Sequence, residues 1–513
     1  MAIAVDWLDK RARLSPEKTA LIDTLGDRRV SYREWNAQAN RTARFLAEGL
    51  GVAKGDRVAV LATNSVEYLD VWFACNKLGA ILHNLNWRLA LPELERLVAD
   101  AAPRVLIYSD DFLDTVRGLA ASDHAASIEH LVAFTEKTAD SHTAFVERDG
   151  YPATAPQRPA MAQDDPWVIC YTGGTTGLPK GVILTHGNIT WNAVNTVMSW
   201  GVGAEDAAIL NAPLFHTGGL NVFTAPLVQA GGTSVVCRGF DADQVFDWVA
   251  SGEVTLYFGV PTMFQVLQEH PRWSEVDFSP LKVVISGGAP CPRPVFERFW
   301  QRGVDFKTGY GMTEAGPNTF WLPPEQVRSK PGAVGYPLFH IEAKIVDEHG
   351  AAVTVPGRAG ELLVRGPHRT PGYWNNPEAT AEAIDDGGWL HTGDLAEVDA
   401  DGAYTIVGRA KDMFISGGEN VYPAEVESVI YGHEAVSEAA LFGVPDQKWG
   451  EVGFAVVVLR SGAKLTEQAL RDYCKERLAP YKCPRQVAFV DELPKTGAGK
   501  IDKKALQARY GNG

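Results

Sequence analysis

A short stretch rich in glycine and threonine, YTGGTTGLPKGV at residues 171–182, combines the residue types that bind phosphate. Glycines let backbone N–H groups converge on an anion, threonine hydroxyls add donors, and the lysine adds positive charge. A flexible surface turn is the simpler alternative, but three threonines and a lysine beside the glycines favour a phosphate site. The candidate phosphate ligands are Thr172, Gly173, Gly174, Thr175, Thr176, Gly177 and Lys180.

The stretch differs from the P-loop pattern G-x-x-x-x-G-K-[ST]. Pro179 precedes Lys180 and Gly181 follows it, where a P-loop has Ser or Thr and begins a helix. The flanking segments WVICY and GVILT have the β-branched and aromatic composition of strands. We therefore predict a loop that joins two strands and binds a triphosphate or pyrophosphate group.

Composition limits the proteins to which such a loop could belong. With 513 residues and 45% hydrophobic content, the chain can bury more than one large core and is predicted to be multidomain. A net charge of -15 argues against nucleic acid or an anionic membrane as the main partner. Six cysteines without a C-x-x-C pair predict reduced thiols and a cytoplasmic setting, and we find no signal peptide or apolar run of membrane-spanning length.

Helical and strand patterns alternate along most of the chain, which predicts helices that cover parallel sheets. From about residue 332 the segments become shorter and β-rich, which predicts a small β subdomain. The last hundred residues have a helix and strand alternation of their own, typical of a small α+β domain. The fold class is therefore α/β, with a large N-terminal domain and a smaller C-terminal α+β domain joined by the polar segment GRAKDMF.

Four further motifs follow the glycine-rich stretch: YGMTE at 310–314, HTGD at 391–394, GRAKDMFISGGENVYPAEVE at 408–427 and PKTGAGKI at 494–501. In this order the five motifs resemble the superfamily of acyl-CoA synthetases, luciferases and peptide-synthetase adenylation domains. Each motif alone is modestly specific, whereas a chance resemblance of five motifs in this order is very improbable. The resemblance implies an ATP- and acyl-binding domain over residues 1–408, a hinge at 409–412 that includes Lys411, and a mobile C-terminal lid over 413–513.

The resemblance also implies a two-step reaction. A carboxylate attacks the α-phosphorus of ATP to give an acyl-adenylate and pyrophosphate, and a thiol, usually that of coenzyme A, then displaces AMP. Because a carboxylate must approach a polyanion, the site needs positive charge and positioning. Lys500 matches the adenylation lysine of the family, although without the motif it would be read as a solvated lysine near Lys503 and Lys504, and Ala498 stands where the family more often has Thr or Ser.

Several nucleotide-binding roles follow from the same resemblance. Thr313 would contact phosphate, and the Glu314 carboxylate would be linked to Mg²⁺, a hard cation that takes oxygen ligands. Tyr310 would lie against adenine, while Asp394 would accept hydrogen bonds from the ribose hydroxyls. The remaining implied ATP-binding residues are Gly288, Ala289, Pro290, Gly311, Met312 and Arg409.

The sites for the acid and for coenzyme A rest on shorter matches. PLFHTGGLNVF at 213–223 matches the segment that lines the acyl cavity of relatives, with His216 near the reacting carboxylate, although His216 could equally be a hydrogen-bonded core residue. The implied acyl-pocket residues are Phe215, His216 and Gly287. The implied coenzyme A contacts, which could also be solvated surface residues, are Gly417, Gly418, Arg88, Trp449, Tyr481 and Arg485.

These observations predict an ATP- and Mg²⁺-dependent carboxylic acid–CoA ligase for a medium-chain fatty or aryl acid. One alternative passes the acyl group to a carrier protein or another acceptor, and a second is a noncatalytic nucleotide sensor, which would not need Lys500, Glu314 and Asp394 together. We expect no nucleic-acid partner and no integral membrane segment, and a homodimer is one possible assembly. The sequence leaves open the acid, the pathway and the regulation.

Overall fold

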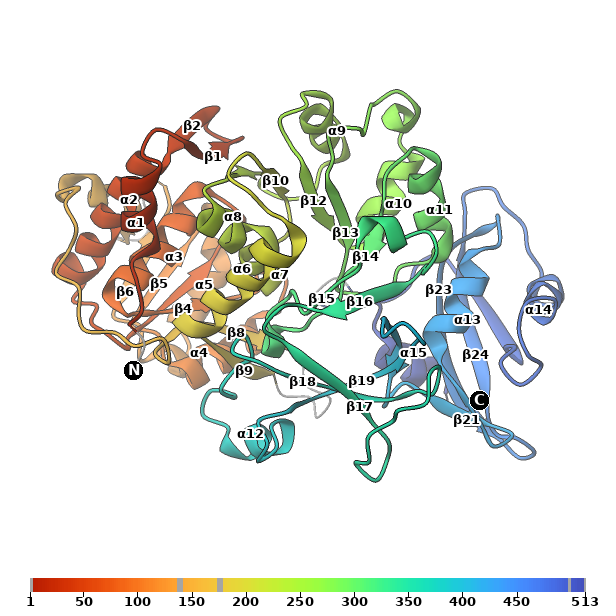
Figure 1. Cartoon of the computed structure of the whole chain (residues 1–513). Coiled ribbons are helices and arrows are strands. Elements are labelled where there is room, and N and C mark those ends of the chain that lie inside the picture. The colour runs from red at the N-terminus through yellow and green to blue at the C-terminus, as the bar shows by residue number, and fades with distance from the viewer. Residues whose placement is uncertain (1–2, 136–141, 173–178, 497–499, 512–513) are drawn as a thin grey trace.

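A computed structural model describes residues 3–135, 142–172, 179–496 and 500–511. The chain forms a large N-terminal α/β domain and a small C-terminal domain, which lies beside α10, α11 and the antiparallel sheet of the larger domain in Figure 1. This architecture confirms the fold class predicted from the sequence.

The first sheet has the strand order β7-β6-β5-β3-β4-β8-β9. Its neighbours are parallel except for β8 and β9, which form an antiparallel pair with Thr172 opposite Lys180. The prediction that strands flank the glycine-rich loop is therefore confirmed. The strands are β3 (Arg57–Leu61), β4 (Ile81–Asn84), β5 (Val105–Tyr108), β6 (His130–Ala133), β7 (Thr143–Ala144), β8 (Pro166–Thr172) and β9 (Lys180–Thr185).

The second sheet has the order β14-β13-β12-β10-β11-β1-β2 and is parallel except for the pair β1 and β2. The carboxyl ends of its parallel strands lie at one edge, where ligands bind in open α/β sheets. The strands are β1 (Thr19–Asp23), β2 (Arg28–Ser31), β10 (Ala207–Leu210), β11 (Thr233–Val236), β12 (Leu256–Gly259), β13 (Val283–Ser286) and β14 (Lys307–Thr308).

The predicted β-rich subdomain is an antiparallel sheet with the order β15-β16-β20-β19-β18-β17. The C-terminal domain has its own sheet, β22-β21-β24-β23, with β25 added in parallel to β24. The strands of the subdomain are β15 (Phe320–Trp321), β16 (Ala333–Pro337), β17 (Glu342–Val346), β18 (Gly360–Arg365), β19 (Leu390–Val398) and β20 (Tyr404–Arg409). Those of the C-terminal domain are β21 (Phe414–Ser416), β22 (Glu419–Val421), β23 (Val436–Asp446), β24 (Gly450–Leu459) and β25 (Gln486–Val490).

Local signals account for where the main helices begin. Ser31 and Glu34 form a reciprocal capping box at the start of α2, and Pro423 occupies the first turn of α13, where its missing N–H has no cost. None of the helices in the described ranges is long and apolar enough to cross a membrane. The helices are α1 (Trp7–Leu14), α2 (Tyr32–Arg44), α3 (Val66–Leu78), α4 (Leu91–Ala101), α5 (Leu113–Ala120), α6 (His186–Trp200), α7 (Thr217–Gly219), α8 (Ala225–Ala230), α9 (Ala242–Ala250), α10 (Pro261–Glu269), α11 (Arg293–Gln301), α12 (Pro377–Ala383), α13 (Pro423–Tyr431), α14 (Glu467–Lys475) and α15 (Lys503–Tyr510).

The core of the N-terminal domain is built around α3, which is buried along almost its whole length. Trp72 on this helix stacks on Trp167 of β8 with ring centroids 5.2 Å apart. The helix also brings Asp70 into the core, where Arg148 pairs with it at 2.5 Å. All six cysteines are free and none is well exposed, as the sequence predicts.

Replacing Arg148 by Met should leave the Asp70 carboxylate buried without its cation. Removal of one partner of a buried pair typically lowers the free energy of unfolding by about 3–5 kcal/mol. Urea unfolding followed by tryptophan fluorescence would measure this loss. Arg33→Met is the matched control, because Arg33 and its partner Glu17 are both exposed, and it should change stability by less than about 1 kcal/mol. Equal effects of the two substitutions would contradict a structural role for the buried pair.

Candidate functional site

The strand pair β8 and β9 positions the described ends of the predicted phosphate loop. Thr172 and Lys180 are direct cross-strand partners, and the Thr172 hydroxyl donates to the Lys180 carbonyl at 3.5 Å. The Lys180 ammonium lies 5.1 Å from the ring centroid of Tyr373, within the range of a cation–π contact. The remaining predicted loop ligands, Gly173, Gly174, Thr175, Thr176 and Gly177, lie outside the described residues.

Glu314 lies in a short 3-10 turn, Thr313–Ala315, and is 7% exposed. The Tyr373 hydroxyl donates to Glu314 Oε1 at 3.0 Å. Burial is the main reason that the pKa of Glu314 is raised, and the hydroxyl of Tyr373 and the charge of Arg409 offset that rise only in part. Glu314 is therefore a buried carboxylate whose negative charge is only partly balanced by its neighbours, and such a group is suited to binding a cation.

A divalent cation at Glu314 would need further ligands from outside the protein. The described residues contain no group of three or more His, Cys, Asp or Glu side chains able to hold a metal ion. Mg²⁺ bound to a nucleotide usually takes one or two carboxylates and completes its shell with phosphate oxygens and water. The lone Glu314 fits this pattern of coordination.

Asp394 is held between two partners from different parts of the N-terminal domain. It accepts a hydrogen bond from the Tyr310 hydroxyl at 2.6 Å and pairs with Arg409 Nε at 2.9 Å. Asp394 and Arg409 are opposite residues on β19 and β20, so the antiparallel register brings them together.

Gly311, between Tyr310 and Met312, leaves no space for a side chain, because an added Cβ would lie 2.2 Å from the Pro317 carbonyl oxygen.

Lys500 approaches these groups from the C-terminal domain. Solvent reaches part of the side chain, yet burial by the surrounding protein lowers its pKa, and the nearby positive charge of Arg409 lowers it further. Asp394 and Glu314 act in the opposite direction and raise it. Lys411, in the turn after β20, also has a lowered pKa, through burial and then Arg409. The structure therefore brings together charged groups that are far apart in the sequence.

His216 is also close enough to Lys500 for the charge of the lysine to act on it. Its Nδ1 accepts a hydrogen bond from the Gly218 N–H at 3.1 Å, which leaves Nε2 to carry the proton. Burial, followed by the positive charges of Lys500 and Arg88, lowers the pKa of His216 to about 4. His216 is consequently neutral at pH 7.

An aromatic wall adjoins His216. Phe258, on the central strand β12, is only partly buried, although most of the strands around it are fully buried. Its ring edges meet two glycines: a Cβ added to Gly287 would lie 3.0 Å from Phe258 Cε2, and one added to Gly218 would lie 3.3 Å from Cε1. Phe215 continues the wall, with its ring centroid 6.1 Å from that of Trp87 in an edge-on contact.

The residues predicted to line the adenine, Gly288, Ala289 and Pro290, form the bend that follows β13. Gly288 has a φ of +80°, a conformation that favours glycine. The bend follows Gly287 directly, so one loop borders both the acyl wall and the predicted nucleotide site.

The residues predicted to bind coenzyme A fall into two places. Gly417 donates its N–H to the Trp449 carbonyl at 2.8 Å, and the Arg485 guanidinium lies 5.5 Å from the Trp449 ring centroid. Tyr481 packs against the core of the same domain, and Gly418 follows Gly417 with a φ of +88°. Arg88 lies apart from them, because its guanidinium covers Trp87 and Phe215 at 4.7 and 5.7 Å.

Sequence reasoning missed two residues that the geometry emphasises. Tyr373 comes from the loop before α12, where Gly372 and Trp374 bond to β9 and thereby bring the tyrosine between Glu314 and Lys180. Phe258 lies within an apolar strand and differs from its neighbours only in exposure. Neither position carries a sequence signal that distinguishes it from ordinary packing.

Comparison with known proteins places most of the chain in a described family. A family model described as "AMP-binding enzyme" matches residues 8–374, and one described as "AMP-binding enzyme C-terminal domain" matches residues 425–500. A feruloyl-CoA synthase from Amycolatopsis sp is 42% identical over 98% of both chains. An indoleacetate–CoA ligase from Aromatoleum aromaticum is 39% identical over 97% of this chain and 96% of its own.

Solved structures with similar folds cover nearly the whole chain as well. ATP-bound MatB from Rhodopseudomonas palustris superposes with a TM-score of 0.88 at 32% identity, covering 98% of this chain and 99% of its own. The anthranilate CoA ligase AuaEII, solved with anthranoyl-AMP, gives a TM-score of 0.90 at 31% identity, covering 99% of this chain and 97% of its own.

The electrostatic environment of Lys500 can be tested without a ligand. The pKa of its amine should lie below the ordinary value of 10.5, fall further in Asp394→Asn, and rise in Arg409→Met, because these substitutions remove charges of opposite sign. Reductive ¹³C-methylation followed by an NMR pH titration would measure all three values. Asp472→Asn is the control, since Asp472 pairs with Lys475 on α14 instead. An unaltered titration in both site variants would mean that Lys500 does not lie among these charges.

Proposed function

This chain belongs to the AMP-binding enzymes, the adenylate-forming superfamily of acyl-CoA synthetases, luciferases and peptide-synthetase adenylation domains, and we propose that it activates an aryl carboxylic acid. It is an AMP-forming acid–CoA ligase that works through an acyl-adenylate, as its full-length relatives indicate. Those relatives include ligases of aryl acids and of long-chain fatty acids. The choice of an aryl acid over a fatty acid is therefore what we propose.

The wall beside His216 is the observation that supports an aryl acid. Gly287, directly after β13, and Gly218, in α7, flank the Phe258 ring of β12, and neither glycine has a side chain that would cover the ring. Aromatic pairs prefer offset-stacked or edge-on contacts, and each contributes about 0.5–1.5 kcal/mol beyond its buried area. Phe215, next to His216 in the chain, forms an edge-on aromatic pair with Trp87. A planar ring therefore has more to gain here than a flexible alkyl chain.

Lys500 is the group proposed to bring the acid onto ATP. The acid is already ionised at neutral pH, so the step needs no general base, and a neutral His216 adds no charge that would compete for the carboxylate. The Lys500 ammonium would neutralise the carboxylate and the α-phosphate as the new C–O–P bond forms and pyrophosphate leaves. Its partners Asp394 and Glu314 raise its pKa and so favour the charged form that the step requires.

The nucleotide would lie across the groups that the N-terminal domain holds together. Thr172, Thr313 and Lys180 would contact phosphates, and Asp394 would exchange its Tyr310 partner for the ribose hydroxyls. A Mg²⁺ ion linked to Glu314 would supply charge neutralisation at the phosphates. The adenine would lie against the bend at residues 287–290 and the Tyr310 ring.

The second step requires Lys500 to withdraw so that a thiol can reach the adenylate. We assign the movement to the turn at residues 409–412, where Lys411 lies between β20 and β21. The glycine pair Gly417 and Gly418, next to Trp449, would then face the pantetheine arm. Reduced cysteines and the acidic surface are consistent with a cytoplasmic enzyme.

The substrate class can be tested by pyrophosphate release from ATP and Mg²⁺ over acetate, octanoate, palmitate, benzoates, cinnamates and indoleacetate, each with and without CoA. We expect kcat/KM to be highest for an aryl acid and turnover to be sustained only with CoA. A preference for octanoate or palmitate would contradict the aryl assignment, CoA-independent release in a single burst would indicate another acceptor, and no release with any acid would favour a nucleotide sensor.

Lys500→Ala should lower pyrophosphate release by about 10²–10³-fold, because removal of one charge-stabilising donor raises the barrier by roughly 3 kcal/mol or more. Lys464→Ala, at an exposed lysine of the same domain, is the matched control and should retain the wild-type rate. Thioester formation from a supplied acyl-adenylate should change little in either variant. A Lys500→Ala enzyme that released pyrophosphate at the control rate would remove the lysine from the mechanism.

Gly287→Ala should narrow the proposed acyl pocket beside Phe258. The added methyl group would lie 3.0 Å from Phe258 and must displace the ring, and a methyl-sized change in a substrate pocket typically alters kcat/KM by about 10–200-fold. We expect such a loss for aryl acids and a smaller one for acetate. Gly239→Ala, where a Cβ would meet nothing within 4 Å, serves as the control. A uniform loss for all acids would contradict a role in selecting the ring.

A further inference from the structure

The segment that carries Lys500 is a narrow hairpin. Lys495 and Ile501 form an antiparallel bridge, and the Thr496 N–H donates to the Lys500 carbonyl at 2.7 Å. The Asp502 N–H closes the base of the hairpin on the Pro494 carbonyl at 2.8 Å. The position of Lys500 is therefore set by whatever holds the two limbs of this hairpin against the domain.

The returning limb is held by packing and by charge. Ile501 and the buried Leu506 belong to the apolar cluster on one face of the C-terminal sheet. Lys503, at the start of α15, pairs with Glu427 of α13 at 2.6 Å, and Glu427 also accepts the Leu441 N–H of β23. These contacts anchor the limb that follows Lys500.

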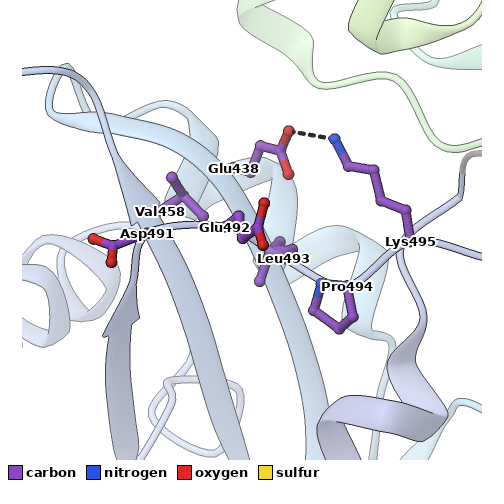
Figure 2. A pocket seen from close by; sticks show the side chains of 7 residues that line it. All are labelled: Glu438, Val458, Asp491, Glu492, Leu493, Pro494 and Lys495. Carbon is purple, nitrogen blue, oxygen red and sulfur yellow. Dashed lines mark hydrogen bonds and ion pairs between the residues drawn. The ribbon is translucent and has the colours of Figure 1, made fainter.

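The outgoing limb is held differently. After the buried Leu493 it borders a cavity of about 310 Å³. Lys495 and Glu438 of β23 point toward each other at this cavity (Figure 2), and their ammonium and carboxylate groups are 2.9 Å apart. The cavity is lined by Glu438, Val458, Asp491, Glu492, Leu493, Pro494 and Lys495.

We propose that the ion pair between Lys495 and Glu438 positions the hairpin so that Lys500 reaches the reacting groups, which makes both members positioning residues for the adenylation step. The inference rests on the proposed role of Lys500. Lys495 is 42% exposed and Glu438 is 21% exposed, so the pair contributes little to overall stability. It lies five residues from Lys500 along a hairpin, however, and small displacements of a catalytic group have large effects on rate.

The decisive experiment compares the two half-reactions in Glu438→Lys, in Lys495→Glu and in the double charge swap. Acid-dependent exchange of pyrophosphate into ATP needs Lys500, whereas thioester formation from supplied acyl-adenylate and CoA does not. Each single substitution should lower exchange by about 5–10-fold and leave thioester formation within about twofold, and the double swap should restore exchange to within about threefold of the wild-type rate.

Asp472→Asn is the matched control, because it breaks another exposed ion pair of the C-terminal domain, the one with Lys475 on α14. It should alter neither half-reaction. Unchanged exchange in both single variants, an equal loss in both half-reactions, or a double swap no better than the single variants would each overturn the proposal. Thermal unfolding of every variant should stay close to that of the wild type, and the milder Glu438→Gln and Lys495→Met variants replace any that do not fold.

A second readout does not depend on activity. In the ¹³C-methyl titration, the pKa of the Lys500 amine should move toward the ordinary value of 10.5 in each single variant, because a displaced hairpin takes it away from the surrounding protein and from Arg409. The double swap should return it to the wild-type position. If the wild-type enzyme exchanged no pyrophosphate with any acid, the proposed function would fail, and this titration would still decide whether the pair positions Lys500.

Discussion

The meeting of charged groups from two domains, Lys500 of the C-terminal domain with Arg409, Asp394 and Glu314 of the N-terminal domain, is the constraint on which the site depends. Burial and then the positive charge of Arg409 lower the pKa of Lys500, so keeping its amine charged there costs free energy in the absence of an anion. Asp394 and Glu314 offset part of that cost. A nucleotide and a carboxylate would supply the missing negative charge, and the site is thus electrostatically prepared for its substrates before they bind.

The fold meets this requirement by supplying the charges from separate elements. The register of β19 and β20 pairs Asp394 with Arg409, and the loop that carries Tyr373 attaches Glu314 to the strand pair β8 and β9, the proposed phosphate site. The C-terminal domain then adds Lys500 from a separate hairpin. Arg460, after β24, also forms an ion pair with Glu269 at the end of α10, so the two domains meet away from the site as well.

The surroundings of His216, the proposed acyl side of the site, are largely aromatic. His216 is kept neutral by burial and by nearby cations, and its Nδ1 is occupied by the Gly218 N–H. Phe258, Phe215 and Trp87 carry no charge, and the nearby cations are Lys500 and Arg88, whose guanidinium covers Trp87 and Phe215.

The sequence by itself determined the class of chemistry, because the glycine-rich stretch, YGMTE, HTGD and PKTGAGK are local patterns whose residue types and order suffice for recognition. It also indicated the α/β, β-rich and α+β regions, since helix and strand periodicity are local properties. Tyr373, Phe258 and the pair of Lys495 with Glu438 were decided only by the tertiary structure. Their roles depend on which strands lie side by side and on where a glycine leaves space. Such contacts join positions far apart in the chain, and no local pattern of residues records them.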